Sequence, residues 1–174
     1  MENPVLEPEL REAALAARLA ALGISTVTHA HDPVFTVAEA RALRGSLPGG
    51  HTKNLFLKDK KGGLWLVVAR EELRIDLNAL AKALGSPRFS FGSAGLLVSV
   101  LGVPPGSVTP FAVMNDTENV VRVVLDEGLL VLDPLNFHPL RNDRTTAISP
   151  AGLLGFLRST GHDPLIAGLP ETAP

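Results

Sequence analysis

Lys53 and Asn54 stand side by side before an apolar run, within the segment from His51 to Leu57. At the polar start of a strand, a lysine can supply positive charge to a phosphate or to a developing oxyanion. An asparagine amide both donates and accepts hydrogen bonds, which suits a ribose hydroxyl or a carbonyl. Each residue taken alone also fits a structural role, because strand-end lysines are usually solvated and asparagines often bond nearby backbone.

A histidine lies far downstream, in the turn from Asn136 to Leu140. His138 can position a hydroxyl or a water, or transfer a proton near neutral pH. A structural histidine bonded to a backbone carbonyl is an equally good interpretation of this residue. His29 and His31 have the spacing of a metal-binding pair on a strand, but no acidic cluster accompanies them, so we expect no metal site.

The loop Gly106-Ser107-Val108-Thr109-Pro110 follows two further prolines. Its glycine permits unusual backbone angles and a close approach of a ligand, and exposed N–H groups there can hold a substrate carbonyl. A simple turn into a strand explains the same residues. A second glycine-rich loop, 91–95, lacks the Gly-Lys-Ser/Thr ending of a phosphate-binding loop. The serines have no Gly-x-Ser-x-Gly context, so a serine nucleophile is not expected.

The composition excludes several kinds of site. The 174 residues contain no cysteine, which rules out disulfides, thiolate metal sites and thiol nucleophiles. The net charge is −2, but residues 51–88 hold eight Lys/Arg and four Asp/Glu, whereas residues 89–140 hold one Arg and five acids. The basic segment can meet phosphates, although charge alone favours an ordinary mixed surface. No membrane span or signal peptide is evident, so we expect a cytoplasmic protein.

The elements that must position these residues alternate between helix and strand. Apolar spacing and capping signals predict helices over 9–22, from the Thr36–Glu39 capping box to about 44, and over 76–84, 94–101 and 150–159. In the first helix, four leucines are expected to share one face: Leu10, Leu15, Leu19 and Leu22. Strands are predicted over 24–30, 51–58, 64–70, 108–114, 120–125 and 145–148, with a hairpin turn at 59–63 and a Gly/Pro-rich tail from 161. This irregular alternation predicts an α+β domain with a mixed sheet.

Four segments, in this order and spacing, resemble the YbaK/ProRS-associated aminoacyl-tRNA editing domains, and especially the free-standing Ala-tRNA(Pro) deacylase group (ProXp-ala, PrdX-like). They are Phe35-Thr36-Val37-Ala38-Glu39, Lys53-Asn54-Leu55-Phe56-Leu57, Gly106 to Phe111, and His138-Pro139 with Asn142 and Thr145. The resemblance covers about residues 33–164. It implies a mixed, partly barrel-like sheet with flanking helices, in one editing domain over 1–174 whose core spans about 24–164.

The resemblance also implies site residues. The lysine of the family falls on Lys53, and the asparagine and histidine typical of the Ala-specific group fall on Asn54 and His138. These three are the expected catalytic residues. The residues expected to bind the substrate are Phe35, Thr36, Gly106, Ser107, Val108, Thr109 and Pro110.

The function that the resemblance implies is hydrolysis of mischarged Ala-tRNA(Pro), with no cofactor and no metal. The expected partner is the acceptor end of aminoacyl-tRNA, and prolyl-tRNA synthetase is a candidate second partner. Two alternatives stay open: a deacylase of the same family for another amino acid, such as Ser or Cys, and a non-catalytic RNA-binding module of this fold. The joint presence of Lys53, Asn54 and His138 argues against the second alternative.

Overall fold

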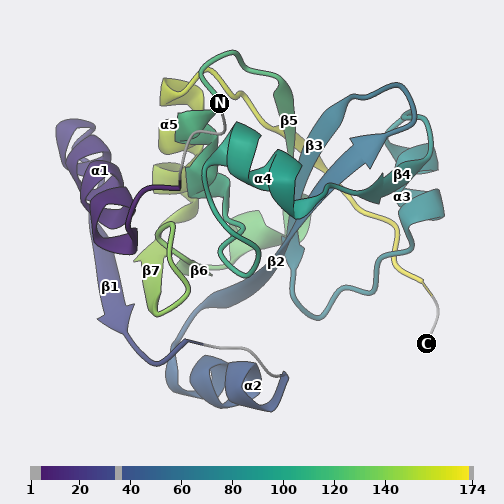
Figure 1. Ribbon diagram of the computed structural model, residues 1–174. Coiled ribbons are helices and arrows are strands. Elements are labelled where there is room, and N and C mark those ends of the chain that lie inside the picture. The colour runs from purple at the N-terminus through teal and green to yellow at the C-terminus, as the bar shows by residue number, and fades with distance from the viewer. Residues whose placement is uncertain (1–4, 34–36, 173–174) are drawn as a thin grey trace.

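The structure is a computed structural model that describes residues 5–33 and 37–172 (Figure 1). Eight strands within these residues form one mixed sheet with the order β1-β7-β6-β2-β3-β5-β8, and β4 pairs with β2 outside this path. The strands are β1 (Thr26–Ala30), β2 (Gly50–Asp59), β3 (Leu64–Arg70), β4 (Phe89–Phe91), β5 (Val121–Asp126), β6 (Leu135–Phe137), β7 (Arg144–Ile148) and β8 (Leu165–Ala167). In the described part of the chain β1 and β8 do not pair, so the sheet is not closed into a barrel.

Helices cover both faces of this sheet. They are α1 (Pro8–Ala21), α2 (Val37–Ser46), α3 (Leu77–Ala83), α4 (Ala94–Leu101) and α5 (Pro150–Ser159), with the 3-10 helices η1 (Pro110–Asn115) and η2 (Glu127–Val131). Figure 1 shows α2 at one end of β2, and β4 and α3 near its other end. Within residues 5–33 and 37–172, none of the helices combines the length and the apolar character that crossing a bilayer requires.

Two apolar clusters lie on opposite faces of the sheet. The larger one joins α1, α4, α5 and η1 to the sheet, and the smaller one joins α3 and β4 to it. In β2, Phe56 belongs to the larger cluster and Leu57 to the smaller one. Since successive side chains of a strand point to opposite faces, Asn54 lies on the face of Phe56 and Lys53 on the face of Leu57.

The predicted starts of three helices are confirmed. Each has a side-chain oxygen that accepts a backbone N–H of the first turn, as capping requires. The pairs are Asp76 with Ala79 at 3.0 Å, Ser93 with Leu96 at 3.1 Å and Ser149 with Gly152 at 3.0 Å. The predicted capping residue of α2, Thr36, lies outside the described residues.

The expected strand over 108–114 is wrong, because this segment forms the 3-10 helix η1. Pro110 stands at its start and the hydroxyl of Thr109 accepts the backbone N–H of Phe111, which together favour a helical turn over a strand. Three strands of three residues each were not predicted, namely β4, β6 and β8. Such short segments show too little alternation to be recognised from the sequence.

The expected face of the first helix is partly wrong. Leu15 and Leu19 are buried, but Leu10 is 56% and Leu22 is 40% exposed. Arg11 joins the buried stripe instead, because it precedes Leu15 by four residues and its Nε donates to the carbonyl of Leu140 at 2.7 Å. Helix α1 is therefore tied to the turn that carries His138.

Candidate active site

A cavity of about 140 Å³ opens where the first half of β2 meets β6 and β7. The residues around it are Leu43, Leu47, His51, Thr52, Asn54, Glu71, Asn136, Phe137, His138 and Thr145. The topology explains their convergence, since β6 pairs in parallel with the start of β2 and antiparallel with β7. Asn54 and His138, both predicted as catalytic, are thus brought to one cavity from distant parts of the sequence.

Asn136 links strand β6 to the start of β2 at the cavity. Its side-chain Nδ2 donates to the carbonyls of Pro48 and Gly50 at 3.0 and 3.1 Å, and its own carbonyl accepts the hydroxyl of Thr52 at 3.2 Å. The side chain is buried, and the two Nδ2 bonds use both of its amide hydrogens. Asn136 therefore fixes the start of β2 against β6, and the sequence analysis did not assign it this role.

A hydrogen bond and a close backbone approach also fix the turn between α2 and β2. Nε2 of His51 donates to the carbonyl of Leu47 at 2.9 Å. Gly49 has a φ of 101°, and a Cβ atom there would lie 2.2 Å from the carbonyl oxygen of Pro134. A larger residue would have to displace the backbone of the segment before β6, so glycine is required. These contacts place Leu43 and Leu47 as the apolar wall of the cavity.

His138 is oriented by one backbone bond. Its Nδ1 lies 2.9 Å from the carbonyl oxygen of Arg144, and because a carbonyl can only accept, Nδ1 carries the hydrogen. In the neutral ring, Nε2 is then an acceptor. Burial lowers the pKa of His138 below its usual value, and the bond to Arg144 offsets this only partly. The imidazole is therefore neutral and able to take a proton at physiological pH.

The turn that carries His138 contains a left-handed residue. Leu140 has a φ of 65°, which is costly for a residue with a branched side chain, by about 1–3 kcal/mol. Its side chain is 1% exposed, and its carbonyl accepts the bond from Arg11. Burial and this hydrogen bond hold the turn in a conformation that the local sequence would not choose.

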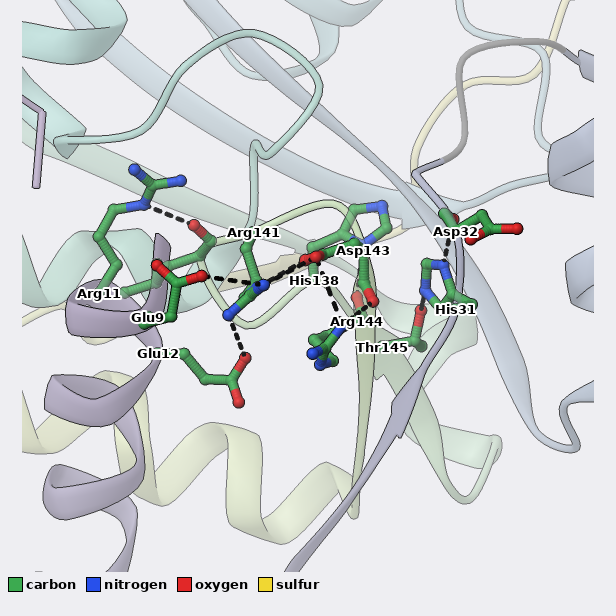
Figure 2. A network of polar contacts seen from close by, with 11 residues as sticks. Glu9, Arg11, Glu12, His31, Asp32, His138, Arg141, Asp143, Arg144 and Thr145 are labelled. Carbon is green, nitrogen blue, oxygen red and sulfur yellow. Dashed lines mark hydrogen bonds and ion pairs between the residues drawn. The ribbon is translucent and has the colours of Figure 1, made fainter. Parts of the chain in front are cut away.

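A polar network attaches the same turn to α1, as Figure 2 shows. Arg141 donates through Nε and Nη2 to both oxygens of Asp143, and its Nη1 and Nη2 lie 3.6 and 3.7 Å from the carboxylates of Glu12 and Glu9. The hydrogen bond from Arg141 lowers the pKa of Asp143 to about 2. The network thus links α1 to the backbone between His138 and Thr145, two residues that line the cavity.

His31 is a neighbour of the cavity that the sequence analysis considered only as a metal ligand. Its Nε2 lies 2.8 Å from the hydroxyl of Thr145, and its ring centroid is 6.2 Å from that of His138. Among the described residues, no group of three or more His, Cys, Asp or Glu is arranged to hold a metal ion. His31 and Thr145 are separated by 114 positions, so no local signal could have paired them.

Asn54 presents an unsatisfied group beside the cavity. Its Nδ2 lies 3.5 Å from the hydroxyl of Thr52, and its Oδ1 is buried with no hydrogen-bond partner among the described residues. An unpaired buried acceptor costs about 1–3 kcal/mol. A donor brought by a ligand would remove this cost.

The structure does not bring Lys53 into the cavity. Its side chain lies on the opposite face of β2, and its ammonium donates to the backbone carbonyl of Leu73. Lys53 is accordingly absent from the residues around the cavity, although its neighbour Asn54 is one of them.

The loop from Gly106 to Pro110 contributes no residue to the lining of the cavity. Gly106 has a φ of 89°, and a Cβ atom there would be 3.7 Å from the side-chain nitrogen of Asn142, just after the His138 turn. Phe111, which follows the loop, packs edge-on against Phe137 with ring centroids 5.7 Å apart. Two further residues predicted to bind the substrate, Phe35 and Thr36, lie outside the described residues.

Known proteins are similar to this chain in sequence and in fold. The profile of the aminoacyl-tRNA editing domain matches residues 31–156. Prolyl-tRNA synthetase associated domain-containing protein 1 of Bos taurus is 44% identical over 163 residues, which cover 91% of this chain and 94% of that protein. Prolyl-tRNA editing protein ProX of Acetoanaerobium sticklandii is 35% identical over 150 residues, covering 86% and 92%. A solved structure of a candidate trans-editing enzyme for prolyl tRNA synthetase has a TM-score of 0.68 at 21% identity, covers 96% and 99%, and shares the fold.

Proposed function

Because the chain belongs to the aminoacyl-tRNA editing domain family, we propose that it hydrolyses the ester bond of mischarged Ala-tRNA(Pro). The observation that carries this proposal is the meeting of Asn54 and His138 in one cavity, with an imidazole nitrogen able to accept a proton. The acceptor end of the tRNA is the proposed ligand. Prolyl-tRNA synthetase is proposed as a second partner, because relatives carry its name.

Alanine is the expected error of a prolyl-tRNA synthetase. A pocket built for proline cannot exclude a smaller apolar amino acid well, since a missing methylene changes binding by only about 1–3 kcal/mol. A second, smaller cavity that hydrolyses alanine esters and rejects proline supplies the remaining discrimination. The small cavity next to His138 suits this task.

The proposed chemistry is general-base hydrolysis. Nε2 of His138 takes a proton from water, directly or through the neighbouring ribose hydroxyl, and the water oxygen attacks the ester carbonyl. The tetrahedral oxyanion then collapses, the ester C–O bond breaks, and the ribose oxygen leaves with the proton that His138 took up. Asn54 orients the ribose or the carbonyl, as its amide allows. The loop from Gly106 to Pro110 is proposed to shape the aminoacyl pocket through the residues that it packs against, and Phe35 and Thr36 are proposed to contact the aminoacyl group.

Lys53 is proposed to serve the nucleotide rather than the reacting ester. Its ammonium is bonded to the carbonyl of Leu73, in the segment that follows Glu71 at the edge of the cavity. A lysine has a flexible four-carbon chain and can exchange a carbonyl for a phosphate oxygen. A positive charge at this edge would neutralise a phosphate of the terminal nucleotide.

A deacylation assay with purified protein and a panel of charged tRNAs tests the proposal. Loss of ester from Ala-tRNA(Pro), with Pro-tRNA(Pro) spared, is the expected result. Preferential loss from a Ser or Cys ester would instead identify the alternative deacylase. Ester loss no faster than in buffer, for every tRNA at adequate enzyme, would contradict a catalytic function.

A further inference from the structure

Helix α1 contains a buried arginine, Arg11, whose side chain is 7% exposed. Arginine is seldom buried unless its guanidinium group is hydrogen-bonded, because burying a charge is costly. Burial lowers the pKa of Arg11 below its usual value, which reflects this cost. The helix also precedes residue 31, where the match to the editing-domain profile begins. The contacts of Arg11 therefore show what a segment outside that match contributes to the site.

The guanidinium group donates to two backbone carbonyls. Nε donates to the carbonyl of Leu140 at 2.7 Å, and Nη1 donates to the carbonyl of Leu6. The bond to Leu140 is buried and joins residues 129 positions apart, whereas Leu6 lies only five positions before Arg11. A hydrogen bond from a charged donor is stronger than one from a neutral donor. The bond to Leu140 is therefore a specific attachment of α1 to the His138 turn.

The conformation of this turn determines where the imidazole of His138 lies. The connection 138–143 reverses the chain between the antiparallel strands β6 and β7. Nδ1 of His138 reaches the carbonyl of Arg144, at 2.9 Å, only while the two ends of the connection stay close together. Leu140 has a φ of 65°, a value that residues with a side chain rarely adopt. Without the bond from Arg11, Leu140 would be free to take an extended conformation, and the His138–Arg144 bond would open.

The ion pairs beside this bond are weaker than the bond itself. Nη1 and Nη2 of Arg141 lie 3.6 and 3.7 Å from the carboxylates of Glu12 and Glu9, and the Glu9 side chain is 72% exposed. Long ion pairs near solvent contribute little to stability. Figure 2 shows Arg11 on the same side of the turn as these two carboxylates, bonded directly to the backbone. Arg11 is thus the contact from α1 that fixes the turn most directly.

We propose that Arg11 is a positioning residue of the hydrolytic site, which keeps the His138 turn in the conformation that directs Nε2 of His138 to the cavity. The inference rests on the proposed deacylase function and adds α1 to the parts of the chain that the reaction needs. Arg11 is not among the described residues that border the cavity, and it acts through the backbone of Leu140. The hydrogen on Nδ1 of His138 is held by Arg144, so the tautomer with an acceptor at Nε2 depends on the same turn.

Single-turnover hydrolysis of Ala-tRNA(Pro) by Arg11→Met tests the inference. Methionine keeps a long apolar side chain but has no donor, so the helix can still pack while Leu140 is released. The maximal rate per folded molecule should fall about 10–100-fold, because a small displacement of a catalytic group slows the reaction strongly. The enzyme concentration that gives half of this rate should change by less than about threefold, since Arg11 does not contact the proposed ligand. Arg11→Lys, which keeps a charged donor, should recover most of the rate.

Nuclear magnetic resonance of the His138 ring nitrogens gives a second measurement that needs no turnover. The ¹⁵N chemical shifts of an imidazole report which nitrogen carries the hydrogen, and His138→Ala assigns the signals. The wild-type protein should show the hydrogen on Nδ1, as the bond to Arg144 requires. In Arg11→Met the shifts should move towards a mixture of the two tautomers. A contribution of Arg11 to stability alone would leave them unchanged in the folded protein.

Two variants of the same helix are matched controls. Arg18→Met makes the same substitution at a half-buried position, and Leu15→Val weakens the packing of α1 without touching the turn. Both should retain the wild-type rate per folded molecule and the wild-type His138 shifts. Wild-type rate and shifts in folded Arg11→Met, or an equal loss of rate in Leu15→Val, would overturn the inference. Altered shifts in Arg11→Met, in a protein that hydrolyses no aminoacyl-tRNA, would support the positioning of His138 and contradict the proposed deacylase.

Discussion

Two histidines, His138 and His162, lie in proline-containing turns but differ in how many of their ring nitrogens are hydrogen-bonded within the protein. His162 is 5% exposed and uses both nitrogens: Nε2 lies 2.8 Å from Asp116 and Nδ1 lies 2.9 Å from the hydroxyl of Thr160. His138 uses Nδ1 for a backbone carbonyl and borders a cavity with Nε2 still able to accept. A histidine whose two nitrogens are both bonded inside the protein ties elements together, whereas one with an available acceptor can do chemistry.

The partners of His162 show what it holds. Asp116 also accepts the backbone N–H groups of Val120 and Val121 at 3.1 and 2.9 Å, so the carboxylate joins η1 to the start of β5. His162 adds the segment after α5 to this junction. The sequence analysis placed His162 in a Gly/Pro-rich tail, yet this tail is anchored and contributes β8 to the sheet.

The largest effect on rate is expected from His138→Ala. If His138 is the general base, its loss should slow ester hydrolysis about 10²–10⁴-fold in single-turnover kinetics, with little change in the melting temperature. His29→Ala is the matched control, because His29 is exposed on β1. An unchanged rate per folded molecule in His138→Ala would show that His138, like His162, has only a structural role.

The largest effect on stability is expected from His162→Ala. Removing His162 leaves the buried Asp116 carboxylate without its side-chain hydrogen-bond donor, so the free energy of unfolding should fall by about 3 kcal/mol. Denaturant titration measures this loss. The rate per folded molecule should stay within about twofold, since His162 is not among the residues around the cavity. A selective loss of rate with unchanged stability would break the distinction between the two histidines.

Lys53 tests whether the same reasoning extends to a cation. Its ammonium already has a backbone partner and lies outside the cavity, so Lys53→Ala should slow the chemical step by less than about tenfold and weaken tRNA binding more. Lys53→Arg, which keeps the charge, is the matched control. Single-turnover rates at several enzyme concentrations separate the two effects. A 100-fold slower chemical step would show that the ammonium enters the cavity during the reaction.

Local features of the fold could be predicted from the sequence, and non-local ones could not. The caps at Asp76, Ser93 and Ser149 are local signals, and the helices they begin were predicted correctly. The short parallel pairing of β6 with β2 depends on residues far apart in the chain, so its register has no local signal. This pairing is what brings the His138 turn to Asn54.

The candidate site likewise combines residues that the sequence predicted with contacts that it did not. The resemblance led to Asn54 and His138, which the structure unites, but it gave no sign that His31 faces Thr145. The separation of Lys53 from Asn54 was predictable in principle, because neighbouring residues of a strand point to opposite faces. The sequence analysis treated the two as a pair because they are adjacent, and strand geometry directs them to different partners.

The pH dependence of activity should also distinguish the two histidines. Burial lowers the pKa of His138, so the general base stays neutral to a lower pH than an ordinary histidine. We expect hydrolysis to decline on acidification with an apparent pKa below 6.5, the usual value. A pH–rate profile measured in single turnover shows this decline, and His138→Ala should lack it. If the variant shows the same decline at the same pH, the titrating group is not His138.

The smallest effect is expected from Asp143, at a pH where activity is already lost. The bond from Arg141 lowers the pKa of Asp143 from 3.8 to about 2, so the folded protein binds this proton less readily than the unfolded chain. A carboxyl with a lowered pKa stabilises the fold above its unfolded value, and this contribution is lost as the pH falls through the folded value. Between about pH 4 and pH 2, the wild-type protein should therefore lose more stability than Asp143→Asn, which cannot titrate. Melting curves over this range measure the difference, and parallel curves for the two proteins would show that the Arg141 bond does not hold the His138 turn.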